Sequence, residues 1–325
     1  MTGRLPDLLT LRSTDGGQMD RSLKSLGLDS YHLGWDNSIE PRLTVSSGDR
    51  IQIDSLDASG GQIPRDGTAL HVSSMDFSRL NPVTGPIFVE GAEPGDAIKV
   101  SFESLEVADW GWTGTIAGFG LLADDFPESS CFISKVGDMS VELPFGPVLP
   151  KIPMIGTIGV ALAEPGIHSI VPPSIHGGNM DIRDLGEGST LLLPVAVPGA
   201  LLSVGDPHAA MGDGEVCGTG VETTATSVIR VELVKGAAPR SPVIESSGIS
   251  QRTGASLLTT GIGPDLHRAS IDAIRSMIDE LVRRTGLAPL EAYVLCSLTV
   301  DLKVSELVDA PNWVVSAHIP LSVIR

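Results

Sequence analysis

The sequence HGGNMDIRDLGEGSTLLLPVAVPGALLSVGDPHAAMGDGEVCGTGVET, residues 176–223, alternates glycine-rich segments with apolar runs. The run Thr190–Val197 is bounded by turn-forming residues, a pattern that predicts a strand. The glycines on either side permit positive φ angles and a close approach of neighbouring backbone. This region therefore predicts short strands that are joined by tight turns.

Glycine and proline also separate apolar runs in the rest of the chain. The 37 glycines and 23 prolines among 325 residues separate short apolar runs instead of forming one low-complexity tract. Residues 50–54, Arg-Ile-Gln-Ile-Asp, alternate polar and apolar side chains, as a half-buried strand does. Strands are expected at Leu43–Val45, Arg50–Ile53, Ile87–Glu90, Ala97–Phe102, Thr190–Val197 and Val228–Val234. The sequence thus predicts a mainly β protein.

Helical periodicity is clear in one stretch near the C-terminus. Apolar residues recur at i, i+3 and i+4 over Leu266–Val282, which predicts an amphipathic helix. Asp265 is suited to cap the start of this helix and Gly286 its end. A second helix at Leu290–Leu298 and a strand at Leu302–Val308 complete a small α+β unit. We therefore divide the chain into a β-rich N-terminal domain, 1–150, a β-rich domain with the chemical motifs, 151–240, and an α+β unit, 241–325.

Charge and composition narrow the classes of partner. The formal net charge of −18 disfavours nucleic acids and anionic membranes, because their phosphates would be repelled. Cys131, Cys217 and Cys296 are too few and too scattered for a disulfide framework. The chain shows no apolar run of membrane-spanning length and no signal-type apolar region at its start, so we expect a cytoplasmic protein. Exposed β edges are often covered by neighbouring subunits, so we also expect a homo-oligomer.

Acidic side chains and an imidazole gather in the quoted stretch. They are Asp181, Asp206, His208, Asp213, Glu215 and Glu222. Carboxylates that cluster around a histidine need neutralisation, either by a metal ion or by protons. Oxygen ligands with one histidine suit Zn²⁺, Ca²⁺ or Mn²⁺. Composition alone leaves a second interpretation open, in which these residues form acidic turns at a solvated edge.

Ordered motifs add a family resemblance that covers most of the chain. The segments are Leu56–Ile63, LDASGGQI; Asn81–Asp96, NPVTGPIFVEGAEPGD; Gly118–Pro127, GFGLLADDFP; Gly177–Leu185, GGNMDIRDL; Gly199–Glu222, GALLSVGDPHAAMGDGEVCGTGVE; and Glu291–Val304, EAYVLCSLTVDLKV. Together they resemble the acetamidase/formamidase family. The resemblance implies a β-sandwich or barrel-like fold and a metal-dependent hydrolase that converts small linear amides, such as formamide or acetamide, to ammonia and a carboxylate.

Two positions depart from the family pattern and leave the substrate open. Asn81 stands where the family usually has histidine, and Met211 stands where it usually has glutamine. Two alternatives therefore remain. The chain could hydrolyse another non-peptide C–N bond, as in a ureide or a larger amide. It could also be a non-catalytic binding protein whose acidic cluster holds structural Ca²⁺.

Within the motifs, we assign Asp181, His208 and Glu222 as metal ligands, with zinc as the first choice and calcium as the alternative. Glu215 is the candidate general base, since a carboxylate can pass a proton from water to the leaving ammonia. Glu215 and Glu222 share the base and ligand roles in an order that the sequence leaves open. Cys217 is interpreted as a small buried residue, with a thiol nucleophile as the minor alternative.

Four further residues are candidates for substrate binding. Asp57 and Gln62 could accept or donate hydrogen bonds to the amide. Asn179 could supply a carbonyl oxygen, or it could only hold a left-handed turn. Trp35 could line the pocket, although packing in the core is the simpler interpretation.

Overall fold

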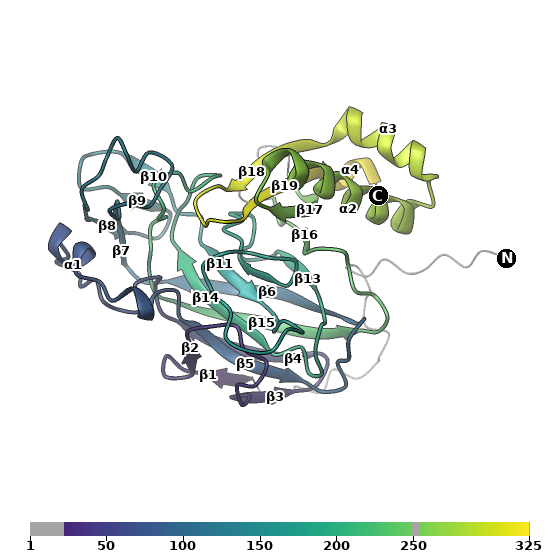
Figure 1. Ribbon diagram of the computed structural model, residues 1–325, viewed down its shortest axis with the longest axis horizontal. Helices are drawn as coiled ribbons and strands as arrows, with labels where there is room; N and C mark the ends of the chain where they lie inside the picture. Colours follow the sequence, from purple (N-terminus) through teal and green to yellow (C-terminus); the bar gives the residue numbers. More distant parts are fainter. Residues whose placement is uncertain (1–22, 249–253, 325) are drawn as a thin grey trace.

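The computed structural model describes residues 23–248 and 254–324, and two β-sheets form its centre (Figure 1). The larger sheet has nine strands in the order β1 (Lys24–Leu26), β4 (Asp49–Ser55), β15 (Ala225–Val234), β6 (Ala97–Val107), β13 (Thr190–Pro194), β16 (Val243–Glu245), β17 (Ser256–Gly263), β19 (Trp313–Pro320) and β18 (Asp301–Glu306). The prediction of a mainly β protein is confirmed, and the sheets of the described residues do not close into a barrel.

A six-stranded sheet packs against one part of the nine-stranded sheet. Its strands are β12 (Gly177–Asn179), β11 (Met154–Gly159), β14 (Leu202–His208), β5 (Val83–Val89) and β2 (Tyr31–His32), with β3 (Leu43–Val45) paired to β5. Apolar side chains from both sheets form one core, for example Ile53 of β4, Ile155 of β11 and Val204 of β14. Along β4, buried and half-buried residues alternate, which confirms the pattern expected for residues 50–54.

Strand β13 explains why the quoted stretch contains an unbroken apolar run. Leu191 and Leu193 face the core between the two sheets, whereas Leu192 packs in a second core beneath the C-terminal helices. A strand that is covered on both faces needs apolar residues at every position instead of at alternate ones.

A helical layer covers the C-terminal part of the nine-stranded sheet (Figure 1). It contains α2 (Leu266–Thr285), α3 (Pro289–Thr299) and the short α4 (Leu321–Ile324). Asp265 accepts a hydrogen bond from Arg268 N at 2.6 Å, and Gly286 is left-handed with φ 76°. Both predicted caps are therefore confirmed. Ala269, Met277 and other apolar residues of α2 are buried in the second core, which also includes residues of β17 and β19.

A third, four-stranded sheet lies apart from the helical layer, at the upper left of Figure 1. Its order is β10 (Val148–Pro150), β9 (Ser140–Glu142), β8 (Phe132–Val136) and β7 (Trp110–Thr113), and the short helices α1 (Ala69–Ser73) and η1 (Phe77–Arg79) lie near it. Backbone bridges join Glu222 to Trp112 of β7 and to His208 at the end of β14. These bridges bring the four-stranded sheet and the six-stranded sheet together at one place.

Strands of the nine-stranded sheet come from each of the three segments 1–150, 151–240 and 241–325. The division into three domains remains a prediction. Within residues 23–248 and 254–324, no helix combines the length and the apolar character that crossing a membrane requires.

Candidate active site

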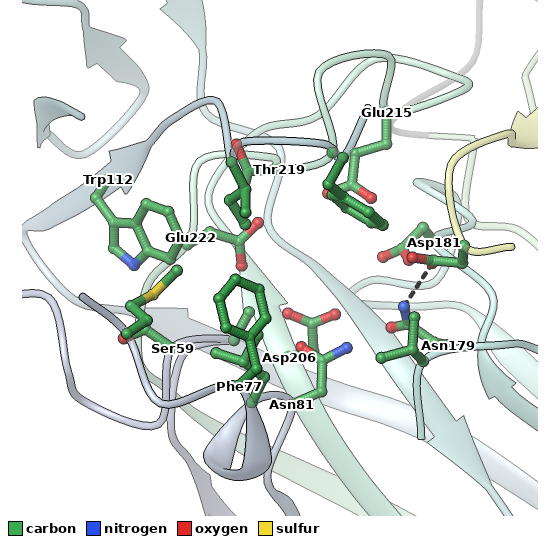
Figure 2. Close-up of a pocket in the computed structure, with 18 of the residues that line it drawn as sticks. Ser59, Phe77, Asn81, Trp112, Asn179, Asp181, Asp206, Glu215, Thr219 and Glu222 are labelled. Atoms are coloured by element: carbon green, nitrogen blue, oxygen red, sulfur yellow. Dashed lines mark hydrogen bonds between the residues drawn. The ribbon is translucent and has the colours of Figure 1, made fainter. Parts of the chain in front are cut away.

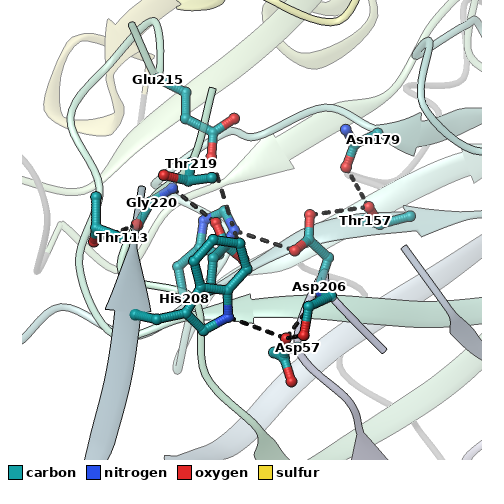
Figure 3. A network of polar contacts seen from close by, with 12 residues as sticks. Asp57, Thr113, Thr157, Asn179, Asp206, His208, Glu215, Thr219 and Gly220 are labelled. Carbon is teal, nitrogen blue, oxygen red and sulfur yellow. Dashed lines mark hydrogen bonds and ion pairs between the residues drawn. The ribbon is translucent and has the colours of Figure 1, made fainter. Parts of the chain in front are cut away.

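The end of β14 carries the centre of a buried polar cluster (Figure 3). Asp206 and His208 are two residues apart, and Asp206 has a positive φ of 58°. His208 Nε2 lies 3.2 Å from Asp206 Oδ1 and 3.1 Å from Glu222 Oε2. Gly220 N donates to Glu222 Oε1 at 2.8 Å, so both oxygens of Glu222 have close partners. One imidazole is thus held between two buried carboxylates.

A second group of ligand-type atoms meets the same imidazole. Asp181 follows β12, and Glu215 lies in the loop after β14; both have positive φ, at 45° and 43°. Single ligand atoms of Asp181, His208 and Glu215 lie within 4.8 Å of one another, and those of Asp206, His208 and Glu222 do the same. Left-handed backbone is unfavourable for residues with a Cβ, and such strain concentrates at functional sites.

The predicted residue Asn179 and three residues outside the predicted set, Thr157, Glu306 and Asp309, complete the cluster. Asn179 Nδ2 donates to Asp309 Oδ2 at 2.5 Å, and Asn179 Oδ1 accepts a hydrogen bond from Thr157 Oγ1. Thr157 Oγ1 also lies 3.3 Å from Asp206 Oδ2. Glu306 Oε1 accepts a hydrogen bond from Asp309 N at 2.6 Å. Asn179 therefore connects the end of β12 to the loop between β18 and β19.

Glu306 and Asp309 were missed by the sequence analysis. They lie more than 80 positions beyond Glu222 in the chain, and no motif in the quoted stretch points to them. The signal that was available is the run of residues 305–311, Ser-Glu-Leu-Val-Asp-Ala-Pro, where two carboxylates interrupt an apolar strand just before a proline turn.

The electrostatics of the cluster favour neutralisation. Burial and the nearby Asp206 raise the pKa of Asp181 well above its ordinary value, and burial raises the pKa of Glu222 to about 7. Burial and Asp181 also raise the pKa of Glu215. Burial alone would lower the pKa of His208, but Glu222 and Asp206 outweigh it and raise that pKa well above its ordinary value. The cluster thus contains more carboxylates than positively charged groups to balance them.

Basic side chains other than His208 do not supply that charge. In residues 23–248 and 254–324, no lysine or arginine forms an ion pair with Asp181, Asp206, Glu215 or Glu222. Both carboxylate oxygens of Asp181 are buried, and among the described residues no amide, hydroxyl or basic group donates a hydrogen bond to them; the carboxyl of Asp309, whose pKa burial also raises, lies beside them. Burying a carboxylate without a compensating charge costs roughly several kcal/mol of folding free energy, even after the surrounding protein relaxes. The cluster is therefore suited to a cation.

A cavity of about 370 Å³ opens onto this cluster (Figure 2). Its polar end is lined by Asn179, Asp181, Asp206, Glu215, Glu222 and Asp309. Apolar side chains line most of the remainder, together with Ser59, Asn81 and Thr219, and Trp112 lies beside the carboxylates. A few polar groups in a mainly apolar hollow are typical of a small-molecule site.

The predicted substrate-binding residues lie at different distances from this cavity. Asn179 lines it. Asp57 is buried behind it and accepts a hydrogen bond from Trp112 Nε1 at 3.1 Å, so it orients a wall residue. Gln62 is among neither the lining residues nor the cluster, and it donates to Ser59 O at 2.8 Å. Trp35 lies in a separate buried group, where its ring packs edge-on against His176 with the centroids 5.1 Å apart.

Comparison with known proteins identifies the relatives of this chain. The sequence profile of the Acetamidase/Formamidase family matches residues 23–168 and 161–325. The chain belongs to the acetamidase/formamidase family. It is 29% identical to the formamidase of Methylophilus methylotrophus, over 90% of this chain and 89% of that protein. The crystal structure of an acetamidase from Bacillus halodurans is 31% identical, covers 92% of this chain and 98% of its own, and has a TM-score of 0.84.

A third relative is a lactamase, an enzyme named for a cyclic amide. The gamma lactamase from Delftia acidovorans is 26% identical to the chain, over 91% of this chain and 89% of that protein, with a TM-score of 0.66. With the formamidase and acetamidase relatives, family membership confirms the prediction of an amidase that acts on C–N bonds other than peptide bonds. The alternative of a non-catalytic binding protein loses its support.

The two departures from the family pattern lie in different places. Asn81 lines the cavity, is nearly buried and has a positive φ of 48°, a conformation that asparagine tolerates better than most residues. Met211 lines a neighbouring hollow on the other side of Glu215. Of these two departures, only Asn81 can therefore touch a molecule in the cavity.

Cys217 also lines the neighbouring hollow and is not among the residues that line the cavity. Its Sγ lies 3.5 Å from Thr219 O. Cys217 is half-buried and not buried as predicted, but its position outside the cavity favours a packing residue over a thiol nucleophile.

Proposed function

We propose that the chain hydrolyses a carboxamide to ammonia and a carboxylate, with a divalent cation bound at the buried cluster. The observation that carries the proposal is the convergence of Asp181, Asp206, His208, Glu215 and Glu222 at one end of the cavity in a chain of the amidase family. Zinc is the first candidate, because one imidazole and several carboxylates form a ligand set that it accepts. Calcium is the alternative, since oxygen ligands predominate.

The donor atoms fit such a cation. Asp206 and Glu222 each place an oxygen near His208 Nε2, and Asp181 offers two oxygens that lack amide, hydroxyl or basic donors among the described residues. We assign Asp181, His208 and Glu222 as ligands, with Asp206 as a further one. A cation at this place would polarise the amide carbonyl and lower the pKa of water.

Proton transfer is assigned to Glu215, because it is less constrained than Glu222. Gly220 N and His208 hold the carboxylate of Glu222, whereas no hydrogen bond to the carboxylate of Glu215 is present in the described part of the chain. Glu215 also lines the cavity. In this proposal Glu215 accepts a proton from the attacking water and later donates it to the departing nitrogen, so the amine leaves as ammonia.

A second candidate is the hydrolysis of a cyclic amide. The Delftia gamma lactamase shares the fold and covers most of the chain, so the same cluster could open a lactam ring. Ring opening releases no ammonia, which separates the two candidates experimentally.

The activity is tested by ammonia release from a panel of linear carboxamides that includes formamide and acetamide, with a γ-lactam followed in parallel by chromatography. Release of ammonia from at least one linear amide is expected. Ring opening without any ammonia release would favour the second candidate, and no reaction with either kind of substrate would reject the proposed function.

We also propose that the chain assembles into a homo-oligomer in the cytoplasm. Large apolar side chains are exposed in and around the four-stranded sheet, including Phe132, Met139, Phe145 and Val148. Scattered apolar residues are common on surfaces, but a group of this kind supports burial by a neighbouring subunit. The mass of the particle in solution tests this assembly.

Gly156 of β11 provides a test of the cluster from outside its ligand set. A Cβ at this position would overlap Asp181 Oδ1 and lie 2.7 Å from Asp206 Oδ2. Gly156→Ala is therefore expected to displace both carboxylates and to lower kcat by about 100-fold, as small misplacements at active sites can do. The measurement is steady-state ammonia release, together with the metal content per chain.

Gly263→Ala is the matched control for Gly156→Ala. Gly263 also lies in a strand, and a Cβ there meets nothing within 4 Å. The control should retain the kcat and the metal content of the parent. Equal kcat values for the two variants would show that the carboxylates beside Gly156 do not need their present positions.

A further inference from the structure

Two chemically distinct groups of side chains line the cavity. Carboxylates and Asn179 form the first group, as described above. The second group is Met75, Phe77, Leu80, Ile116, Phe119 and Val171, which we call the apolar end. Figure 2 shows the ring of Phe77 projecting from η1 toward the carboxylates. A molecule whose reacting group lies at the polar end must therefore place the rest of its atoms against aromatic and aliphatic side chains.

The size of the cavity exceeds the needs of the smallest amides. A volume of about 370 Å³ lies in the range of pockets that enclose drug-sized ligands, roughly 300–1,000 Å³. Formamide has three non-hydrogen atoms and acetamide has four. Either one would leave most of the apolar end in contact with water, and the apolar walls would contribute nothing to its recognition.

We infer that the preferred substrate is an uncharged carboxamide with an apolar acyl group of about six to nine non-hydrogen atoms, which the apolar end of the cavity binds. This inference rests on the proposed function, because it places the amide of the substrate at the cluster. Phenylacetamide and hexanamide represent the class.

Charge and wall chemistry exclude the neighbouring classes. An acyl group that ends in a carboxylate would be repelled by the net charge of −18 and would lose its hydration against the apolar side chains. An acyl group that ends in an ammonium would lose its hydration against Phe77, Phe119 and Ile116, which offer no hydrogen-bond acceptor in their side chains. An aromatic or branched aliphatic group has neither cost.

The test is a comparison of kcat/KM for ammonia release from acetamide, hexanamide, phenylacetamide and adipamate, the last being hexanamide with a terminal carboxylate. Each methylene buried at the apolar end should raise kcat/KM by roughly two- to fourfold, so hexanamide should exceed acetamide by at least about 16-fold. Adipamate should be a poorer substrate than hexanamide. If acetamide equals or exceeds both larger neutral amides, the inference is wrong while the proposed function stands. If no amide releases ammonia, the proposed function fails and the inference fails with it.

Phe77 and Phe126 form a matched pair of variants for the same assay. Both rings are largely exposed, at 60% and 61%, so replacement of either by alanine should leave the fold intact. Only Phe77 lines the cavity. Phe77→Ala should lower kcat/KM for phenylacetamide by about five- to tenfold and that for acetamide by a smaller factor. Phe126→Ala should leave the ratio of the two substrates unchanged. The same ratio in all three proteins would overturn the assignment of the apolar end.

Discussion

Glu215→Gln is expected to lower kcat for amide hydrolysis by about 10²- to 10⁴-fold, which is the usual contribution of a general acid–base group. Glutamine keeps the size of the side chain but cannot take a proton from water at neutral pH. The carboxylate of Glu215 lies 4.0 Å from His208 Nε2 and borders the cavity, so its removal acts at the reacting atoms. Steady-state ammonia release from the best amide of the panel measures the loss.

Glu215→Gln should lose turnover but keep its bound metal and its fold. The ligands Asp181, His208 and Glu222 are untouched, so metal content and thermal unfolding should stay close to those of the parent. Glu280→Gln is the control, because Glu280 of α2 is buried to a similar degree but pairs with Arg283 and Arg284 and does not line the cavity. An unchanged kcat in Glu215→Gln would reject Glu215 as the base and favour Glu222.

His208→Gln is expected to affect metal binding, turnover and stability together. The imidazole is the only basic group among the described residues within 4.0 Å of Asp206 and Glu222. Loss of a ligand should lower metal affinity by at least about 100-fold, which is the upper end of the effect of an outer-shell change. The two carboxylates would lose their partner, and such a loss destabilises by about 3–5 kcal/mol. Metal analysis after dialysis and denaturant unfolding measure the two effects.

His32→Gln is the control for His208→Gln, because it removes a histidine that is not part of the cluster. His32 lies in the group around Trp35, and its Nε2 is 2.8 Å from Ser203 Oγ. This control should keep its metal and its turnover. If His208→Gln also kept the full metal content, His208 would not be a ligand, and the cation would have to be sought among Asp181, Glu306 and Asp309.

Local sequence signals predicted much of the fold. The caps Asp265 and Gly286 define α2 within one residue, because each satisfies backbone groups of its own helix end. The alternation at residues 50–54 defines a strand that is buried on one face. The boundaries of β6 and β15 were predicted too short, because pairing with neighbouring strands extends a strand beyond its most apolar residues.

Residues that are far apart in the sequence meet at the site, and local motifs do not predict such contacts. Asp181, His208, Glu215 and Glu222 lie in one recognisable stretch, whereas Glu306 and Asp309 reach the cluster only through the loop between β18 and β19. Trp35 shows the opposite case, since its fully buried ring fills a gap between strands and does not line the cavity. The apolar end of the cavity depends on residues from three separate segments, 75–80, 116–119 and Val171, and cannot be inferred from any one motif.

Amide hydrolysis by this protein should require a divalent cation at the cluster around His208. The most direct test is ammonia release from the preferred amide by protein stripped with a chelator, followed by titration with Zn²⁺ or Ca²⁺ and metal analysis of the same samples. Stripping should lower the rate by about 100-fold or more, and one of the two ions should restore it as the sites fill. Full activity in protein with negligible bound metal would contradict the account.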